Sequence, residues 1–498
     1  MVISMKRFLA ILLVLSLLLV AGCVKEEVCT SHKDVDADAY CDLCGCCVVV
    51  SVDVYAINDL HGKLADGTNH PGVDELTTFL RAARAGDEHA IFLSAGDMWQ
   101  GSSESNLTRG QILVDWMNEL DFAAMTLGNH EFDWGESYIE ANAAVAEFPF
   151  LAINIYDRAT DTQVDYCQSS VVVDCGAIQV GVIGAMGDCY SSIASDKVQD
   201  VYFKTGAELT ALVKEESQRL RQQGVDVIIY SIHDGGEATS SSTIGANALS
   251  DYYDVSLSNG YVDLVFEGHT HQKYVVQDTY GVYHIQHKGD NTGGISHAEL
   301  SYNVITGEVT VPVAELISTS SYDSLPDDPV VEQLLEKYDE QISISKQVLG
   351  YNAKRRTSNW LRQKLAELYL QAGLEKWGGA YDIVLGGGYF TVRSPYELQA
   401  GNVTYGMLQS IFPFDNELVL CSVKGVDLLN RFIHTSNENY YIAKNGSTTI
   451  DPNGTYYIVV DSYTSSYAPN RLTEIARYGA DLFARDLLAA YVAEGNLE

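Results

Sequence analysis

Five short polar segments each follow an apolar run, and this pattern is the strongest constraint on the fold of the 498-residue chain. The segments are NDLHG at 58–62, GD at 96–97, GNHE at 128–131, His233, and GHTH at 268–271. The apolar runs resemble strands, and helix-like stretches separate them at 73–85, 113–120 and 207–223. Strands that alternate with helices predict a layered α/β domain, in which functional groups gather beyond the carboxyl ends of the strands.

The polar side chains in these segments are of the kinds that hold pairs of divalent cations. A phosphate ester is an anion that repels nucleophiles, and two nearby cations can neutralise it while generating hydroxide from water at neutral pH. Such a pair needs oxygen and imidazole ligands around a shared carboxylate. We therefore expect a two-metal phosphoesterase site built from Asp59, His61, Asp97, Asn129, His233, His269 and His271.

These motifs resemble those of the calcineurin-like metallophosphoesterases, and within them the branch of 5'-nucleotidases and UDP-sugar hydrolases. The resemblance covers nearly all of the chain after residue 50 and implies an α/β (α+β) fold. In that fold, a four-layer β-sandwich flanked by helices precedes a smaller C-terminal α/β nucleotide-binding domain. It also implies a first metal held by Asp59, His61, Asp97 and His271, and a second held by Asp97, Asn129, His233 and His269. Such ligands accept zinc, manganese, iron or cobalt.

The resemblance also gives catalytic roles to His130 and Asp133. His130 would face the scissile phosphate, stabilising charge on its oxygens or protonating the leaving group, and Asp133 would orient the imidazole. Alternatively, or in addition, Asp133 caps a helix predicted at 134–147. His284 and His287 lie in an alternating strand, where satisfaction within the core is the simpler interpretation, and we assign them no role.

Length and charge set the domain plan and the class of partner. We expect a dimetal domain at 49–320, a linker helix within 321–347, which contains the segment PDDPVVEQLLEKYDEQISISKQ, and a substrate-binding domain at 348–498. A net charge of −36 argues against nucleic acid as a macromolecular partner, because a phosphate backbone needs a basic surface. A nucleotide or related small anion would then be drawn by the metals and by local arginines.

The N-terminus resembles a bacterial lipoprotein signal. Residues 1–22 combine Lys6 and Arg7 with a short apolar run, and small residues precede Cys23. We expect cleavage before Cys23 and lipid attachment to it, which would tether the protein to the membrane in the cell envelope, outside the cytoplasm. The alternative is an uncleaved anchor, although the apolar run is short for a spanning helix.

The following segment, 23–48, is rich in cysteine and aspartate. The spacing of Cys29, His32, Cys41 and Cys44 is typical of a structural zinc knuckle, whereas an oxidising compartment favours disulfides among its cysteines. Alternating aspartates also resemble a calcium loop. Further along, Cys167 and Cys175 flank a strand-like segment and could close a hairpin by a disulfide, whereas Cys189 and Cys421 are expected to be unpaired or buried.

The C-terminal part resembles the family's nucleotide-binding domain through GGGYFTVRSP at 386–395 and IFPFDNEL at 411–418. The resemblance implies that Arg393 and Arg356 contact the phosphate, while Phe414 and Tyr463 stack on a base. Two departures weaken the match: Arg393 is displaced by two residues, and the family's GGDG is missing after Tyr463. Core packing is an equal alternative for Phe414, and simple exposure is an alternative for Arg356.

Three functions follow from these residues. The first is an anchored phosphohydrolase that acts on nucleoside monophosphates or related nucleotides. The second keeps the metal centre but acts on a 2',3'-cyclic nucleotide, a nucleotide sugar or a sulfur-containing anion. The third is a surface binding protein whose hydrolase has decayed, and the intact ligand set argues against it.

Overall fold

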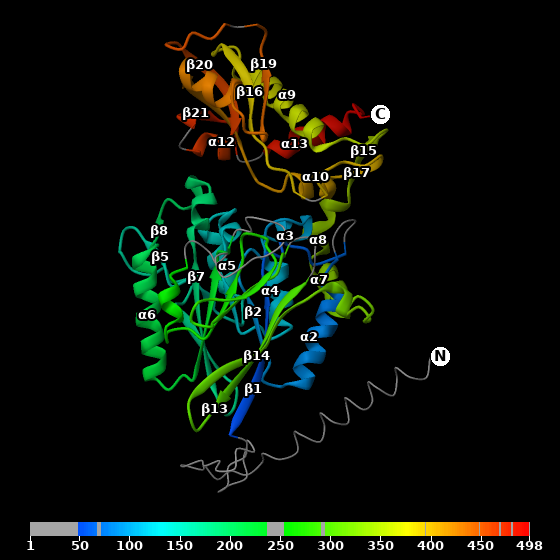
Figure 1. Cartoon of the computed structure of the whole chain (residues 1–498). Helices are drawn as coiled ribbons and strands as arrows, with labels where there is room; N and C mark the ends of the chain where they lie inside the picture. Colours follow the sequence, from blue (N-terminus) through cyan, green and yellow to red (C-terminus); the bar gives the residue numbers. More distant parts are fainter. Residues whose placement is uncertain are drawn as a thin grey trace.

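The computed structural model describes residues 48–66, 71–236, 253–289, 294–393, 395–447, 449–467, 470–479 and 482–497. These residues form a larger N-terminal domain and a smaller C-terminal domain, which lies above it in Figure 1. The predictions for the leader, for Cys23 and for Cys29, His32, Cys41 and Cys44 concern residues outside the described ranges.

Two six-stranded sheets form the centre of the N-terminal domain. The first runs in the order β14 (Glu308–Ile317), β13 (Ile295–Asn303), β1 (Val49–Ile57), β2 (Ile91–Ser94), β3 (Ala124–Thr126) and β4 (Phe150–Leu151). The second runs in the order β11 (Tyr274–Gln277), β12 (Tyr283–Gln286), β10 (Leu264–Glu267), β9 (Val227–His233), β7 (Gln179–Met186) and β6 (Ser170–Asp174). A separate pair consists of β5 (Ile155–Asp157) and β8 (Val201–Phe203).

The strands that precede the polar segments are parallel within each sheet. β1 to β4 pair in parallel, as do β7, β9, β10 and β12. Parallel neighbours direct their carboxyl ends toward the same edge, so the loops after β1, β2, β3, β9 and β10 meet there.

Alternate residues of each central strand face different hydrophobic layers. In β1, Val52, Val54 and Ala56 belong to the cluster between the two sheets, whereas Tyr55 and Ile57 belong to the cluster under the outer helices. This alternation follows from the two-residue period of a strand. A third cluster packs the second sheet against α6. The result is the helix-flanked four-layer sandwich that the sequence predicts.

The helices of this domain flank the sandwich. The predicted helices correspond to α2 (Asp74–Gly86), α4 (Gln111–Asn118) and α6 (Ala207–Gln222), within two residues at each end. The domain also contains α3 (Ser103–Leu107) and α5 (Glu136–Ala143). Helix α2 places Leu76 and Leu80 in the core and exposes Arg81, as the period of an amphipathic helix requires.

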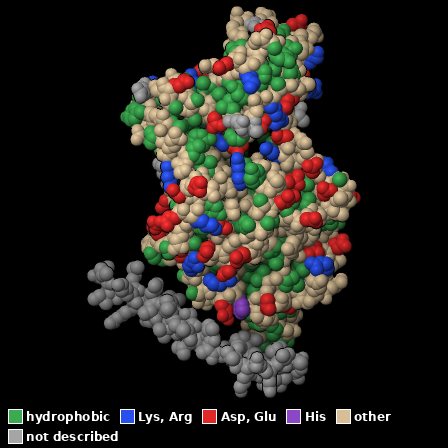
Figure 2. Space-filling view, turned by 180° about the vertical axis from the view of Figure 1, so that it is seen from behind, with side chains coloured by type: hydrophobic (Ala, Val, Ile, Leu, Met, Phe, Trp, Pro, Cys, Tyr) green, Lys and Arg blue, Asp and Glu red, His purple; other side chains and the backbone are tan. Residues whose placement is uncertain are grey.

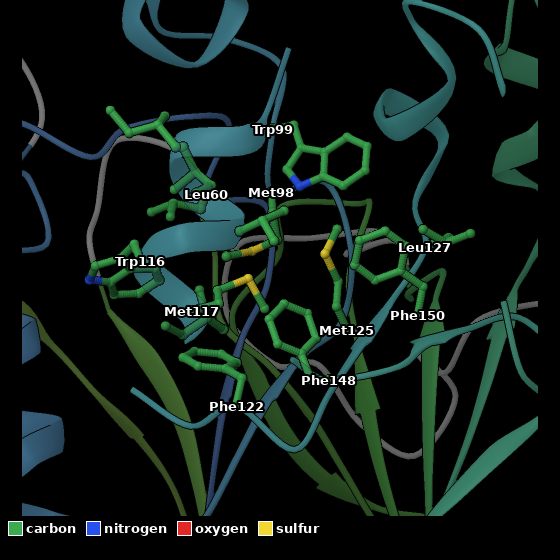
Figure 3. Packing of buried hydrophobic residues seen from close by; sticks show 14 of the residues in the cluster. Leu60, Met98, Trp99, Trp116, Met117, Phe122, Met125, Leu127, Phe148 and Phe150 are labelled. Carbon is green, nitrogen blue, oxygen red and sulfur yellow. The ribbon is translucent and has the colours of Figure 1, made fainter. Parts of the chain in front are cut away.

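A hydrophobic cluster lies directly beneath the polar loops. Leu60 is buried between two predicted ligands, Met98 and Trp99 follow Asp97, and all three side chains belong to the same cluster. Figure 3 shows Leu60, Met98 and Trp99 pointing into this core beside Leu127, which precedes the GNHE segment. Burying the neighbours of a ligand holds the loop backbone in place, so the local sequence both carries and positions the polar groups.

The predicted disulfide between Cys167 and Cys175 is wrong. Both thiols are free and buried, and they belong to different hydrophobic clusters. The two cysteines flank the extended strand β6, whose length separates its ends, whereas a disulfide needs Cα atoms within about 7 Å. Cys189 and Cys421 are free and buried, as expected.

The C-terminal domain has a five-stranded sheet with its own core. The order is β19 (Tyr440–Lys444), β16 (Ile383–Tyr389), β20 (Thr455–Asp461), β18 (Leu418–Lys424) and β21 (Thr473–Arg477). One hydrophobic cluster packs this sheet against α9 (Ser358–Trp377) and α13 (Ala484–Ala493), and another covers the opposite face with a π-helix at Leu428–Ile433. The remaining elements are β15 (Val348–Asn352), β17 (Gly401–Thr404), α10 (Tyr405–Ile411), α11 (Gly425–Asp427) and α12 (Ser462–Ser466).

The glycine triplet in β16 has a packing role. A Cβ atom on Gly386 would lie 2.3 Å from the backbone nitrogen of Leu370 in α9. A Cβ atom on Gly387, whose φ is +139°, would lie 2.1 Å from the carbonyl oxygen of Tyr441 in β19. The triplet therefore allows a helix and a neighbouring strand to approach β16 closely.

The connector between the domains is broken into short helices. The prediction of one helix across the segment was wrong, because the structure has α7 (Pro329–Lys337), α8 (Asp339–Ile342) and a 3₁₀ turn at Ser343–Lys346. Tyr338 separates the first two, and its hydroxyl donates to Asp115 of α4 at 2.6 Å. Asp328 caps the N-terminus of α7 by accepting from Val330 N.

His284 is a buried charged residue in β12 of the second sheet. Its Nδ1 lies 2.9 Å from Glu267 Oε1 and its Nε2 lies 3.4 Å from Asp278 Oδ2. Burial opposes the charged ring, but the two carboxylates outweigh it and raise the pKa of His284 to about 9. Core satisfaction is therefore the role that the structure gives to His284.

Replacing His284 by glutamine is expected to destabilise the protein in a pH-dependent way. The folded pKa lies above the ordinary value of about 6.5, so the stabilisation is complete below that pH and is lost as pH rises through about 9. We expect a loss of about 3 kcal/mol at pH 6 that shrinks toward pH 9.5. Urea unfolding at both pH values measures it, with His89→Gln on the surface as the control. An equal loss at both values would contradict the argument.

The surface carries both signs of charge. Figure 2 shows acidic groups interspersed with lysines and arginines over much of the face that it presents. Within the described residues, no helix is both long enough and apolar enough to cross a membrane.

Candidate active site

Five of the predicted metal ligands have a left-handed backbone. The φ angles are 52° for Asp59, 51° for His61, 55° for Asp97, 70° for His269 and 52° for His271. Residues with a Cβ atom adopt this region at a cost of about 1–3 kcal/mol, and such strain concentrates at functional sites. The sharp turns aim side chains from the ends of three different strands toward a common point.

The first group contains Asp59, His61 and His271. His61 Nε2 lies 3.2 Å from His271 Nε2, and His271 Nε2 lies 3.3 Å from Asp59 Oδ1. His61 Nδ1 lies 3.0 Å from the carbonyl oxygen of Gln100, which must accept a hydrogen from it. The Nε2 atom of neutral His61 therefore presents a lone pair to the group.

The second group contains Asp97, Asn129, His233 and His269. His233 Nδ1 donates to the Ala95 carbonyl oxygen at 2.7 Å, which leaves Nε2 facing Asp97 Oδ2 at 3.1 Å. Asn129 and His269 line the same cleft as Asp97. Asp59, Asp97 and His233 also offer atoms within 4.8 Å of one another, which places the two groups side by side.

The charges of this site suit a cation. Burial would raise the pKa of Asp97, but the surrounding histidines hold it well below its usual range, with His233 the largest of them. Burial lowers the pKa of His269 to about 4 and, together with Arg393 and His271, lowers that of His61 well below its usual value. Anionic carboxylates and neutral imidazoles are the forms that bind metals. His233 differs: burial opposes its charged form, but Asp97 and Asp59 outweigh burial and raise its pKa to about 10, so this ring must lose a proton when it binds a metal.

A buried atom of the site, Asn129 Oδ1, has no hydrogen-bond partner among the described residues. It is fully enclosed, and unsatisfied buried polar atoms are rare in native proteins. A ligand bond would satisfy it. His61 Nε2 presents a lone pair to His271 Nε2 at 3.2 Å, where a cation could bind both nitrogens. The donor set therefore fits divalent metal ions, although it does not select among them.

His130 lies at the rim of this cluster, between two partners. Its Nδ1 lies 2.8 Å from Asp133 Oδ2, and its Nε2 lies 2.8 Å from Arg393 Nη2. Arginine can only donate, so in this contact Nε2 accepts and Nδ1–H donates to Asp133. Burial opposes a charged ring, but Asp133 and Asp97 outweigh it and raise the pKa of His130. Asp133 thus orients the ring and favours its protonation.

One cleft of about 370 Å³ joins this cluster to the C-terminal domain. The Phe414 ring lies beside His130, with centroids 5.9 Å apart and planes tilted by 32°. Tyr463 also lines the cleft, 6.0 Å from the ring of Tyr389. Phe414 is only partly buried, so the alternative of core packing is not what the structure shows.

Two other predictions disagree with the structure. Arg356 does not line this cleft: its guanidinium lies 4.5 Å from the Trp360 ring centre, and its Nε donates to Asn352 at 3.3 Å. Asp133 does not cap α5, because that helix begins at Glu136 after Gly135, which makes no side-chain cap. The predicted helix start was too early.

Several residues of the site were missed from the sequence. Glu131 is buried and accepts backbone hydrogens from Asp97, Met98, Trp99 and Gly128, which ties two ligand loops together. Its position inside GNHE was the available signal. Cys189 lies within 4.8 Å of ligand atoms of His233 and His269, and Tyr389 follows the glycine triplet; neither had a sequence signal.

The comparisons with known proteins agree with this geometry. Residues 52–273 match the family model of the calcineurin-like phosphoesterases. The chain contains a calcineurin-like phosphoesterase domain. Apyrase of Tabanus yao is 25% identical over 81% of this chain and 76% of its own length. Protein UshA of Yersinia enterocolitica is 25% identical over 88% of this chain and 86% of its own.

The fold of the whole chain also has solved counterparts. A crystal structure of a 5'-nucleotidase precursor from Thermus thermophilus superposes with a TM-score of 0.67 at 19% identity, covering 89% of this chain and 96% of that one. The phosphoesterase domain and its C-terminal partner therefore occur together elsewhere. The chain is a metal-dependent phosphoester hydrolase.

Proposed function

We propose that this hydrolase removes phosphate from nucleoside 5'-phosphates. The observation that carries this proposal is that one cleft has the metal-ligand cluster at one end and aromatic rings at the other. A phosphate at the first end would place a planar base near Phe414, Tyr389 and Tyr463. Aromatic faces stack on every nucleobase, so this arrangement selects a phosphate ester with a base.

In this proposal the seven predicted ligands would hold two divalent metal ions, with Asp97 a ligand of both. Bound ions of this kind would neutralise the phosphate and supply a nucleophilic water at neutral pH. His130, oriented by Asp133, protonates the leaving oxygen. Arg393 contacts the phosphate from the C-terminal domain, and its present contact with His130 puts it within reach of the same position.

The proposal is tested by phosphate release from a panel of substrates. We expect release from AMP that stops with chelator and returns with added zinc, manganese, iron or cobalt. The panel includes a 2',3'-cyclic nucleotide, a nucleotide sugar and glycerol 2-phosphate, which has no ring. Release from glycerol 2-phosphate without release from any nucleotide would overturn the nucleotide assignment and leave the hydrolase intact.

We also propose that the enzyme acts outside the cytoplasm, anchored by lipid at Cys23. The small residues before that cysteine and the apolar run upstream support this proposal. Replacing Cys23 by alanine should move activity from the membrane fraction to the soluble fraction, and unchanged partitioning would argue against the anchor.

For the cysteine-rich segment, we propose a structural zinc site at Cys29, His32, Cys41 and Cys44. Metal analysis of a Cys41→Ser variant tests it.

Replacing Phe414 by alanine is expected to raise KM for AMP by about tenfold, because base stacking contributes about 1–3 kcal/mol. KM for glycerol 2-phosphate should stay within about twofold, since that ester offers no ring to stack. Steady-state kinetics on both esters measure the difference. Tyr467→Ala, which removes a half-exposed ring of the same domain outside the cleft, is the control. Equal losses on both esters would indicate a folding defect instead of lost stacking.

A further inference from the structure

The loop that carries Phe414 is held from within its own domain by a buried arginine. This loop connects α10 to β18 and has no regular structure of its own over its central residues. Arg485, near the start of α13, donates through Nη1 to the carbonyl oxygens of Pro413 at 3.3 Å and Phe414 at 3.0 Å. Its Nη2 donates to Asp415 Oδ1. The backbone on both sides of the Phe414 side chain is therefore fixed by one guanidinium.

Asp415 continues this contact into the phosphoesterase domain. Its second oxygen, Oδ2, accepts from Nη1 of Arg109, which is 306 residues earlier in the chain. The Asp415 side chain is 9% exposed, so water screens the two ion pairs only weakly. Hydrogen bonds between charged groups are stronger than neutral ones and demand defined geometry. One carboxylate thus joins a loop of one domain to a side chain of the other.

Arg109 is itself held in a defined position. Its φ of 53° is left-handed, at the turn before α4. Its carbonyl oxygen accepts from Asn142 Nδ2 at 2.8 Å, and its guanidinium lies 5.5 Å from the ring centres of Trp134 and Tyr138. A cation stacked between two rings loses little further freedom when it pairs with a carboxylate. The Arg109 guanidinium is therefore already positioned for its ion pair with Asp415.

We propose that Arg109 is a positioning residue that, through Asp415, sets the Phe414 ring against His130 and so tightens binding of esters that carry an aromatic group. Arg109 and His130 both belong to the phosphoesterase domain: Arg109 precedes α4, and His130 follows β3. The Arg393 guanidinium, which donates to His130 Nε2, lies 5.9 Å from the Phe414 ring centre. Only the identity of the natural substrate in this inference rests on the proposed function.

The first test replaces Arg109 by glutamine. This change removes the charge but leaves the Arg485–Asp415 pair, so the C-terminal domain keeps its internal contact. We expect KM for AMP to rise about tenfold, with kcat falling by less than about threefold, because the change acts on ring placement and not on the metal cluster. KM for glycerol 2-phosphate should not change. Arg109→Lys, which keeps the charge, should restore most of the loss.

The matched control is another arginine that joins the two domains. Arg477 Nη1 lies 3.5 Å from Asp196 Oδ2, and this arginine makes no contact with Arg109 or Asp415 among its ion pairs. Arg477→Gln should leave KM for AMP within about twofold of wild type. An equal rise in both variants would mean that any interdomain ion pair has this effect, and it would overturn the specific role of Arg109.

The decisive measurement is a double-mutant cycle with Phe414→Ala. If Arg109 acts through the Phe414 ring, Arg109→Gln has no further effect on KM once the ring is removed. If the two substitutions instead raised KM by independent factors that multiply in the double variant, the proposal would be overturned. The same cycle is run on phenyl phosphate, which carries a ring but no nucleoside. If wild-type protein failed on AMP, the proposed function would fall, while the phenyl phosphate cycle would still decide the role of Arg109.

Discussion

Replacing Asp97 by asparagine is expected to lower kcat/KM by about a thousandfold or more through loss of metal. In the proposed site Asp97 would be a ligand of both metals: its atoms lie within 4.8 Å of ligand atoms of Asp59 and His233, and its Oδ1 accepts from His130 N at 2.9 Å. Asparagine keeps the shape but loses the negative charge that two cations require. A loss of several kcal/mol of transition-state stabilisation corresponds to at least about this factor. Metal analysis of the purified variant should show less bound metal than wild type.

The control for this change is Asp121→Asn. Asp121 also has a left-handed backbone, with φ of 52°, but it is exposed on the surface after α4. Asparagine tolerates that conformation, so neither variant carries a backbone penalty. Asp121→Asn should keep wild-type activity and metal. Full metal content in Asp97→Asn together with lost activity would contradict the role of Asp97 as a shared ligand.

The ligand cluster could be predicted because its chemistry is local to strand ends. His233 ends a strand, and Asp59 and Asp97 lie two and three residues beyond one. All three strands have a clear apolar pattern, and parallel strands bring such ends to one edge. The sandwich could be predicted for the same reason, since alternation along β1 divides its residues between two cores. In both cases the residues that show the sequence pattern are the same residues that lie in the site or in the core.

The errors arose from side-chain contacts that leave no pattern in the sequence. The connector helix ends early because Tyr338 turns its hydroxyl toward Asp115, a residue of α4. Arg356 seemed free to bind phosphate, but the Trp360 ring four residues later holds its guanidinium. Neither contact leaves a periodic trace in the chain, so propensity alone could not show them.

The interdomain contacts also could not be predicted from the sequence. Asp415 lies in a loop whose sequence gives no sign that its partner is Arg109, and Phe414 could equally have been a core residue. Only the packing of the two domains against each other brings Asp415 to Arg109 and Phe414 to His130. Local sequence patterns predicted the fold, whereas the aromatic end of the cleft depends on the arrangement between the domains.

His130→Ala is expected to lower kcat on AMP by about a hundredfold to ten-thousandfold while the metal content stays at the wild-type level. The two ring nitrogens of His130 contact Asp133 and Arg393, and the ring lies edge-on against His61 with centroids 5.2 Å apart, so neither ring nitrogen holds a proposed ligand in place. A metal analysis that found the site emptied in His130→Ala would make the residue a structural support of the cluster instead. His434→Ala, at an exposed histidine of the C-terminal domain, is the control for general effects of the change.

The dependence of this loss on the leaving group separates the two proposed roles of His130. If the imidazole protonates the leaving oxygen, the loss should be large for AMP, whose alkoxide leaves poorly, and much smaller for p-nitrophenyl phosphate, whose phenolate needs no proton. If it only stabilises charge on the phosphate oxygens, the loss should be similar for both esters. Asp133→Asn should follow the same pattern more weakly, because the ring stays in place but loses the carboxylate that favours its charged form. Equal losses on the two esters would therefore assign His130 to the phosphate and remove it from proton transfer.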